Sequence, residues 1–230
     1  MLDLFAPDSM IPGLIVGITL IVFTFYSLKK KQLNFTGTIF ANIVGLISFI
    51  LGGLPSFLAM ALFYLVAESA TKFGRAERNQ HEQRTSSNII GNAGAAMIAL
   101  ILGQVTPFFG AVAAALSDTV SSELGLLSKK KPVLITTFQQ VEKGTDGGIT
   151  LLGLITGLLG AGIIGILYYF TVQASLVVAG IIILAGFLGS LVDSILGATL
   201  ERKGILTNTY VNFFASSSGA IIVFLLTRII

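Results

Sequence analysis

Four carboxylates occur within or at the edges of apolar stretches of this chain: Glu68, Asp118, Glu123 and Asp193. Such groups are costly in an apolar environment, and in membrane segments they usually mark functional sites. Asp118 and Glu123 are five residues apart, which is about 140° of rotation on a regular helix. They converge only if the helix loosens near Gly125. Otherwise each meets a different partner, or both are independent interfacial carboxylates.

Asp193 lies on a face of small and polar residues. Gly186, Ser190, Asp193 and Gly197 follow a 4-3-4 spacing, which places them on one side of a helix. Small side chains there let another backbone or a ligand come close. Ordinary helix packing would explain the glycines, but it would not explain the carboxylate.

A glycine-rich segment, residues 143–150, precedes another apolar stretch. Glycines before a helix N-terminus can present backbone N–H groups to a phosphate, and a lysine adds positive charge. The candidate phosphate-binding residues are Lys143, Gly144, Gly147 and Gly148. The alternative is a plain turn capped by Asp146. The order of residues is not that of a P-loop.

Two asparagine pairs open two more apolar stretches, Asn88 with Asn92 and Asn208 with Asn212. A spacing of four residues puts both members of each pair on one helix face. They would either orient a substrate or form hydrogen bonds between helices. Glu68 and Lys72 have the same spacing, which favours an ion pair on a helix surface.

This set of carboxylates, glycines, basic residues and amides fits Mg²⁺-dependent phosphoryl transfer. Carboxylates hold Mg²⁺ through one or two direct contacts, and substrate phosphates complete its shell. Positioning and charge neutralisation supply most of that catalysis. The chain has no cysteine and a single histidine, His81, in a charged stretch. Thiol catalysis and clusters of Cys or His ligands are therefore excluded.

The elements that position these residues are membrane helices. Only 11% of the 230 residues are charged, against roughly 25% in soluble domains, and 54% are hydrophobic. Glycine is abundant, with 26 residues, as in transmembrane helices that approach one another closely. The composition predicts an all-α, polytopic transmembrane helical bundle, with residues 1–230 forming a single integral membrane domain.

About eight spans are expected, because a bilayer core needs about 20 apolar residues per helix. The predicted spans are Ile11–Leu28, Phe35–Gly52, Pro55–Ser69, Ile89–Leu102, Phe108–Leu127, Ile149–Phe170, Leu176–Leu200 and Asn212–Thr227.

Basic residues alternate along the connections between these spans. Thirteen of the 14 fall on one side of the membrane, and only Arg228 falls on the other. The positive-inside rule makes the first side cytoplasmic and puts both termini outside. The carboxylates and asparagine pairs then all lie toward cytoplasmic helix ends. The basic excess is a topology signal, and no nucleic-acid partner is expected.

The chain resembles the family of transmembrane protein 19 and of the plant and cyanobacterial phytyl-phosphate kinases. The matching stretches occur in the family's order and cover nearly the whole chain. They are residues 83–92, 117–125, 132–135, 144–148, 189–198 and 208–212. One departure is Glu201, where glutamine is expected in many relatives.

The resemblance implies an integral membrane prenyl-phosphate kinase at the cytoplasmic interface of the cell membrane. It would transfer a phosphoryl group from a nucleoside triphosphate, with CTP as a candidate, to a prenyl monophosphate. Asp118, Glu123 and Asp193 would be catalytic and hold Mg²⁺. Lys143, Gly144, Gly147, Gly148 and Arg84 would bind nucleotide phosphate, and Asn88, Asn92, Asn208 and Asn212 would orient substrates.

Two other functions stay open at this point. A nucleotidyltransferase similar to CDP-lipid synthases would release pyrophosphate and leave a CMP group on the lipid. A lipid or small-molecule transporter would use polar residues along the whole membrane path. A faint internal symmetry favours it, because the fifth and seventh predicted spans each centre on an aspartate and the fourth and eighth each begin with an asparagine pair. The outer halves of the predicted spans carry almost nothing polar.

Overall fold

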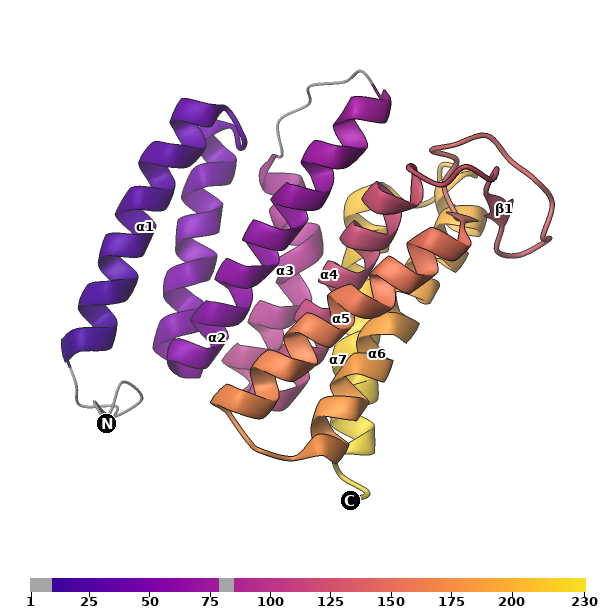
Figure 1. Cartoon of the computed structure of the whole chain (residues 1–230). Coiled ribbons are helices and arrows are strands. Elements are labelled where there is room, and N and C mark those ends of the chain that lie inside the picture. Colours follow the sequence, from indigo (N-terminus) through magenta and orange to yellow (C-terminus); the bar gives the residue numbers. More distant parts are fainter. Residues whose placement is uncertain (1–9, 79–84) are drawn as a thin grey trace.

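The computed structural model describes residues 10–78 and 85–230, and most of them are helical (Figure 1). The helices are α1 Met10–Lys30, α2 Phe35–Arg78, α3 Ser86–Ile101, α4 Val105–Gly125, α5 Leu151–Thr171, α6 Leu176–Leu196 and α7 Asn208–Leu226, with a short π-helix η1 at Gly197–Glu201. Two short strands, β1 Val133–Leu134 and β2 Gly148–Ile149, pair antiparallel between α4 and α5. The prediction of an all-α bundle is confirmed.

Helix α2 contains two predicted spans joined by a sharp bend. Gly53 has φ 71° and ψ −172°, a conformation outside the helical region that glycine adopts without steric strain. Pro55 follows at once, in the first turn of the second arm, where its missing N–H is tolerated. With the two arms counted separately, the described residues form eight α-helical segments at the predicted positions.

Five of these helices, α1, α2, α5, α6 and α7, are long and apolar enough to cross a membrane. Helix α4 is not in this group, because its C-terminal half carries Asp118, Glu123 and several hydroxyl side chains. The count of eight spans, and the assignment of both termini to the outside, therefore stay predictions.

Helix α4 lies at the centre of the bundle, packed against α2, α3, α5, α6 and α7. Every residue from Pro107 to Ser117 is buried, with Phe108, Phe109 and Leu116 at 0% exposure. Close approach of the surrounding helices requires glycine. A Cβ on Gly110 would lie 2.6 Å from the carbonyl oxygen of Gly219 in α7, so α4 and α7 touch backbone to backbone. The glycine-rich composition thus serves helix packing, as predicted.

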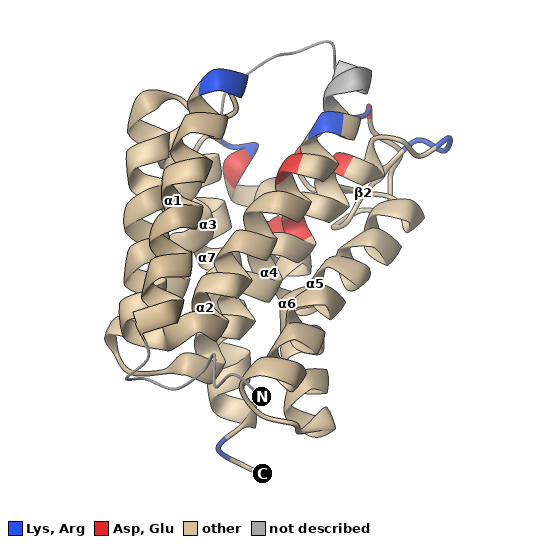
Figure 2. Cartoon of the chain, turned by 60° about the vertical axis from the view of Figure 1, so that its left-hand side comes forward, with Lys and Arg blue, Asp and Glu red and all other residues tan. Residues whose placement is uncertain are grey.

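The two ends of the bundle differ in charge. The first turn of α1 and the last turn of α7 lie at one end, and the β1–β2 segment lies at the other (Figure 1). Lys, Arg, Asp and Glu side chains of the described residues gather in the half with the β-strands, and one basic residue lies beside the C-terminus (Figure 2). The structure therefore places the predicted cytoplasmic connections together.

Cysteine labelling will test which end faces the cytoplasm, because the chain has no native cysteine. Ser128→Cys lies near the β-strand end, and Gln173→Cys lies in the α5–α6 connection at the opposite end (Figure 1). We expect an impermeant thiol reagent added outside intact cells to label Gln173→Cys and to spare Ser128→Cys. Permeabilised cells should show both sites labelled, and the opposite pattern in intact cells would contradict the orientation.

Candidate functional site

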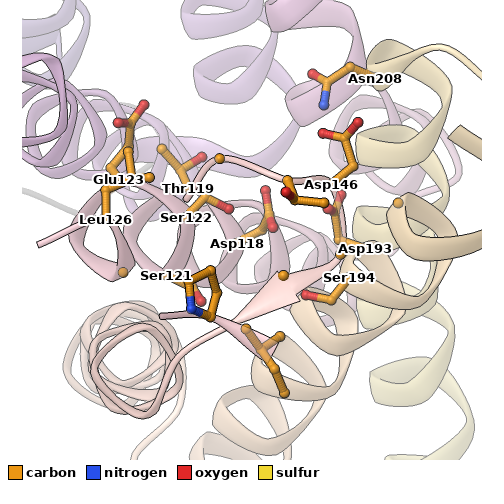
Figure 3. Close-up of a pocket in the computed structure, with 18 of the residues that line it drawn as sticks. Asp118, Thr119, Ser121, Ser122, Glu123, Leu126, Asp146, Asp193, Ser194 and Asn208 are labelled. Atoms are coloured by element: carbon orange, nitrogen blue, oxygen red, sulfur yellow. The ribbon is translucent and has the colours of Figure 1, made fainter. Parts of the chain in front are cut away.

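A polar pocket of about 690 Å³ opens in the charged half of the bundle (Figure 3). Its walls come from the second arm of α2, from α3, α4, α6, η1 and α7, and from the loop between α4 and α5. All eleven candidate site residues that lie within the described residues line this pocket. They are Asn88, Asn92, Asp118, Glu123, Lys143, Gly144, Gly147, Gly148, Asp193, Asn208 and Asn212. Arg84, Gln83 and His81 lie outside the described residues.

Asp118 of α4 and Asp193 of α6 face each other in this pocket. Their carboxylates interact electrostatically, and Oδ2 of Asp193 is buried with no hydrogen-bond donor among the described residues. The two helices are held in register beneath them, because Ser117 Oγ donates a hydrogen bond of 3.0 Å to Ser190 Oγ. Two half-buried carboxylates at close range repel each other unless a proton or a cation lies between them.

Glu123 does not converge with these two residues. Helix α4 stays helical through Gly125 and does not loosen there. The Glu123 side chain lies against Gly74 of α2, where an added Cβ would clash with its carboxylate. In Figure 3 Glu123 lies on the opposite side of Asp118 from Asp193. Of the arrangements considered from the sequence, the structure has the one in which the two carboxylates of α4 face different partners: Asp118 faces Asp193, and Glu123 lies against α2.

The residues present fit a divalent cation held by two carboxylates rather than by three. In residues 10–78 and 85–230, no group of three or more Asp, Glu, His or Cys side chains is close enough to bind one ion. Mg²⁺ is often bound through only one or two carboxylates, with water and substrate phosphates supplying the other oxygens. The unpaired, buried Oδ2 atom of Asp193 is consistent with such a ligand. This arrangement favours Asp118 and Asp193 as the pair.

Two acidic residues of the pocket were not predicted as site residues. Glu201 and Asp146 line it, and both interact electrostatically with Asp193. Glu201 is eight residues after Asp193, which on a regular α-helix leaves it about 80° off the same face. The π-helix η1 between them absorbs one extra residue and turns Glu201 back toward Asp193. The sequence gives no signal for this turn.

The glycine-rich loop is ordered by contacts with α6. Gly147 has φ 74°, and an added Cβ would overlap Ala198 and the carbonyl oxygen of Ser194. Gly147 also accepts a hydrogen bond of 3.0 Å from the amide of Ile135. The alternative of a turn capped by Asp146 is wrong: Thr150 caps α5, accepting a 3.0 Å bond from the Gly153 amide. Asp146 points into the pocket instead (Figure 3).

Lys143 lies at the pocket rim, where its Nζ donates a 2.7 Å hydrogen bond to the carbonyl oxygen of Leu126. It therefore covers the C-terminal end of α4 and is also the lysine closest in sequence to the glycines. Its charge faces a pocket that is otherwise acidic. A phosphate bound there would meet this ammonium group.

The asparagine pairs form local hydrogen bonds and not the bonds between helices that were one alternative from the sequence. Asn88 caps α3, since its Oδ1 accepts a 2.9 Å bond from the amide of Thr85, and Asn92 donates 2.9 Å to the Asn88 carbonyl. Asn212 donates 3.2 Å to Asn208 Oδ1. These hydrogen bonds are within a helix or its cap rather than between helices. All four side chains also line the pocket.

Glu68 differs from its prediction. It is buried at 3% exposure and accepts a 3.1 Å hydrogen bond from Gln32 Nε2, whereas Lys72 is exposed. The expected surface ion pair between Glu68 and Lys72 is therefore wrong. The sequence suggested the pair through its spacing, but the α1–α2 connection folds back and covers the carboxylate.

Comparisons with known proteins give the family. The sequence profile of the family described as "Integral membrane protein DUF92" matches residues 18–220. The chain belongs to the DUF92 family of integral membrane proteins. It is 36% identical to an uncharacterized membrane protein of Methanocaldococcus jannaschii, over 91% of this chain and 92% of that protein.

Two plant proteins are also similar to this chain. Protein PGR of Arabidopsis thaliana is 32% identical over 78% of this chain and 76% of its own length. Protein VTE6, chloroplastic, of the same plant is 29% identical over 94% of this chain and 72% of its own length. No solved structure matches the chain. The resemblance stated from the sequence motifs is confirmed.

Proposed function

We propose that this DUF92 protein is a prenyl-phosphate kinase. The proposal rests above all on one observation, the half-buried Asp118–Asp193 pair that lines a polar pocket. Its second support is the resemblance to the family of the phytyl-phosphate kinases, together with the 29% identity to protein VTE6. The reaction transfers the terminal phosphoryl group of a nucleoside triphosphate, with CTP as the candidate, to a prenyl monophosphate.

The bonding changes are those of a single displacement at phosphorus. An oxygen of the prenyl monophosphate forms a new P–O bond to the γ-phosphorus, and the bond from that phosphorus to the β-phosphate oxygen breaks. The products are the prenyl diphosphate and a nucleoside diphosphate. A phosphate monoester with a second pKa of about 6 is already largely dianionic at neutral pH, so it needs no general base. This agrees with a pocket whose described lining contains no histidine.

Each part of the pocket has a task in this proposal. Asp118 and Asp193 would hold the cation, and Mg²⁺ there would supply neutralisation of charge on the triphosphate. Lys143 and the loop at Gly144 bind nucleotide phosphate at the rim. Asn88 and Asn92 orient the lipid phosphate from α3, and Asn208 and Asn212 orient a substrate from α7. Glu201 and Asp146 repel a phosphate that approaches without its cation.

The test is a product assay with purified protein. The protein is incubated with Mg²⁺, each nucleoside triphosphate in turn and a set of prenyl monophosphates, and products are identified by mass spectrometry. A kinase yields prenyl diphosphate and nucleoside diphosphate in equal amounts. Pyrophosphate and a CMP-lipid would instead show a nucleotidyltransferase. Uptake into proteoliposomes without any covalent product would show a transporter. Either of these results would overturn the proposal.

A further inference from the structure

A second cavity, of about 300 Å³, lies between α1, α2 and α3. Its wall is almost entirely apolar, with Phe23, Phe57 and Met60 among the lining residues. Val22 and Leu65 also line it and are each 60% exposed on the outer surface of the bundle. In a membrane-spanning chain this surface faces lipid, so the cavity is open to the hydrocarbon of the bilayer.

The apolar cavity meets the polar pocket at α3. Asn88 and Asn92, in the first two turns of α3, line both spaces. Their hydrogen bonds to the α3 cap and backbone fix them at this boundary. A molecule that extends across the two asparagines would have one end in the polar pocket, among carboxylates and hydroxyls. Its other end would lie in the apolar cavity, among aromatic and aliphatic side chains.

One polar group of the cavity wall, the Tyr64 hydroxyl, is held by a hydrogen-bond network. The Tyr64 hydroxyl donates a 2.6 Å hydrogen bond to Gln32 Oε1, and Gln32 in turn donates to the buried Glu68. The Tyr64 ring packs edge-on against Phe23, with centroids 4.9 Å apart. The network therefore ties down the Tyr64 phenol, one of two at the wall with Tyr26, and most of the surface left for a ligand is hydrocarbon.

We propose that this cavity binds the apolar chain of the lipid phosphate acceptor, whose phosphate lies beyond Asn88 and Asn92 in the polar pocket. The identity of the headgroup rests on the proposed function. A nucleotide is a poor occupant, because its base and ribose would leave polar groups unpaired against apolar walls. A prenyl monophosphate that enters from the bilayer places its apolar chain in the cavity and its phosphate in the polar pocket.

The size of the cavity predicts a particular dependence on chain length. Ligand pockets typically span about 300–1,000 Å³, and this one is at the lower limit. It encloses the isoprene units next to the phosphate, while the remainder of a long chain passes between α1 and α2 into lipid. Binding should therefore strengthen from dimethylallyl to geranyl monophosphate, and then change little for farnesyl and longer chains.

The first experiment is photo-crosslinking without nucleotide, using a farnesyl monophosphate analogue that carries a diazirine near its first isoprene units. Adducts are mapped by mass spectrometry. We expect them on residues such as Phe57, Met60 and Ala93, and unlabelled farnesyl monophosphate should compete. Adducts confined to α5–α7 would overturn the proposal. Equal labelling by the matching farnesol analogue would also overturn it, because the cavity would then take any membrane lipid.

The second experiment fills the cavity. Ala61 lines it and is half-buried, so Ala61→Leu should raise the KM for farnesyl monophosphate about tenfold through lost apolar contact. The KM for dimethylallyl monophosphate and for nucleotide should change little. Gly162→Leu is the control, since a Cβ there meets open space on α5. A raised nucleotide KM in Ala61→Leu would overturn the proposal by placing the base in the cavity.

The two proposals fail in different ways. Prenyl diphosphate formation with adducts on α5–α7 would remove the tail site and leave the kinase. Adducts in the cavity without any diphosphate would remove the kinase and leave a prenyl-phosphate site. If Ala61→Leu does not fold, crosslinking of the unaltered protein still decides the question.

Discussion

Replacing Asp118 or Asp193 with asparagine should lower kcat on the order of 10³-fold, because metal charge compensation is worth several kcal/mol in the transition state. The substitution keeps the shape of the side chain and removes its charge. The two carboxylates repel each other when neither a proton nor a cation lies between them. In EDTA, the melting temperature of each variant should therefore equal or exceed that of the unaltered protein.

Binding of Mg²⁺ gives a second measurement that does not depend on turnover. A cation that binds only the folded state raises the melting temperature, so Mg²⁺ should stabilise the unaltered protein and neither variant. Glu142→Gln is a suitable control, because Glu142 forms an exposed ion pair of 2.6 Å with Lys131 and is outside the pocket lining. Near-normal kcat, or an unchanged response to Mg²⁺, would remove that aspartate from the metal site.

The second large effect is expected at Gly147. Gly147→Ala combines a left-handed backbone conformation with overlap against Ala198 and the Ser194 carbonyl, so the loop must leave α6. We expect activity to fall at least 100-fold, roughly the loss of 3 kcal/mol of positioning. The KM for nucleotide should rise as well, because the loop carries Lys143 at the pocket rim. The transmembrane helices should stay folded.

Gly204→Ala is the matched control for this prediction. Gly204 has φ 70°, close to that of Gly147, but it is outside the pocket lining and an added Cβ there meets nothing within 4 Å. It carries the backbone cost of about 1 kcal/mol without the steric overlap. Equal losses in the two variants would show that backbone strain alone matters, and that docking of the loop on α6 has no part in activity.

Much of this fold was predictable because a chain in lipid must satisfy its backbone hydrogen bonds internally, and a helix does so. Apolar runs such as Leu176–Leu196 have no alternative to a buried or lipid-facing helix, and glycine or charged connections mark their ends. The bend at Gly53 was predictable in position, since Gly53 is followed by Pro55. The pocket residues were predictable as a set because costly polar groups recur at the same helix ends.

The directions of individual side chains were less predictable. The choice between Thr150 and Asp146 as the cap of α5 depends on where the loop turns, and the β1–β2 pairing decides that. Glu201 enters the pocket only through a π turn. Glu68 is covered by a connection distant in sequence. Each of these outcomes depends on tertiary contacts, which local spacing does not encode.

The enclosed position of α4 has a consequence for biogenesis. A helix with Asp118 and Glu123 in its second half is a poor substrate for independent insertion, because an aspartate near a helix centre costs about 2.5–3.5 kcal/mol on translocon scales. Its neighbours α5, α6 and α7 are synthesised after it. The ribosome must therefore deliver about 100 further residues, up to Leu226, before α4 is shielded on every side. During that interval α4 depends on α2 and α3, or on an insertase, to stay out of contact with lipid.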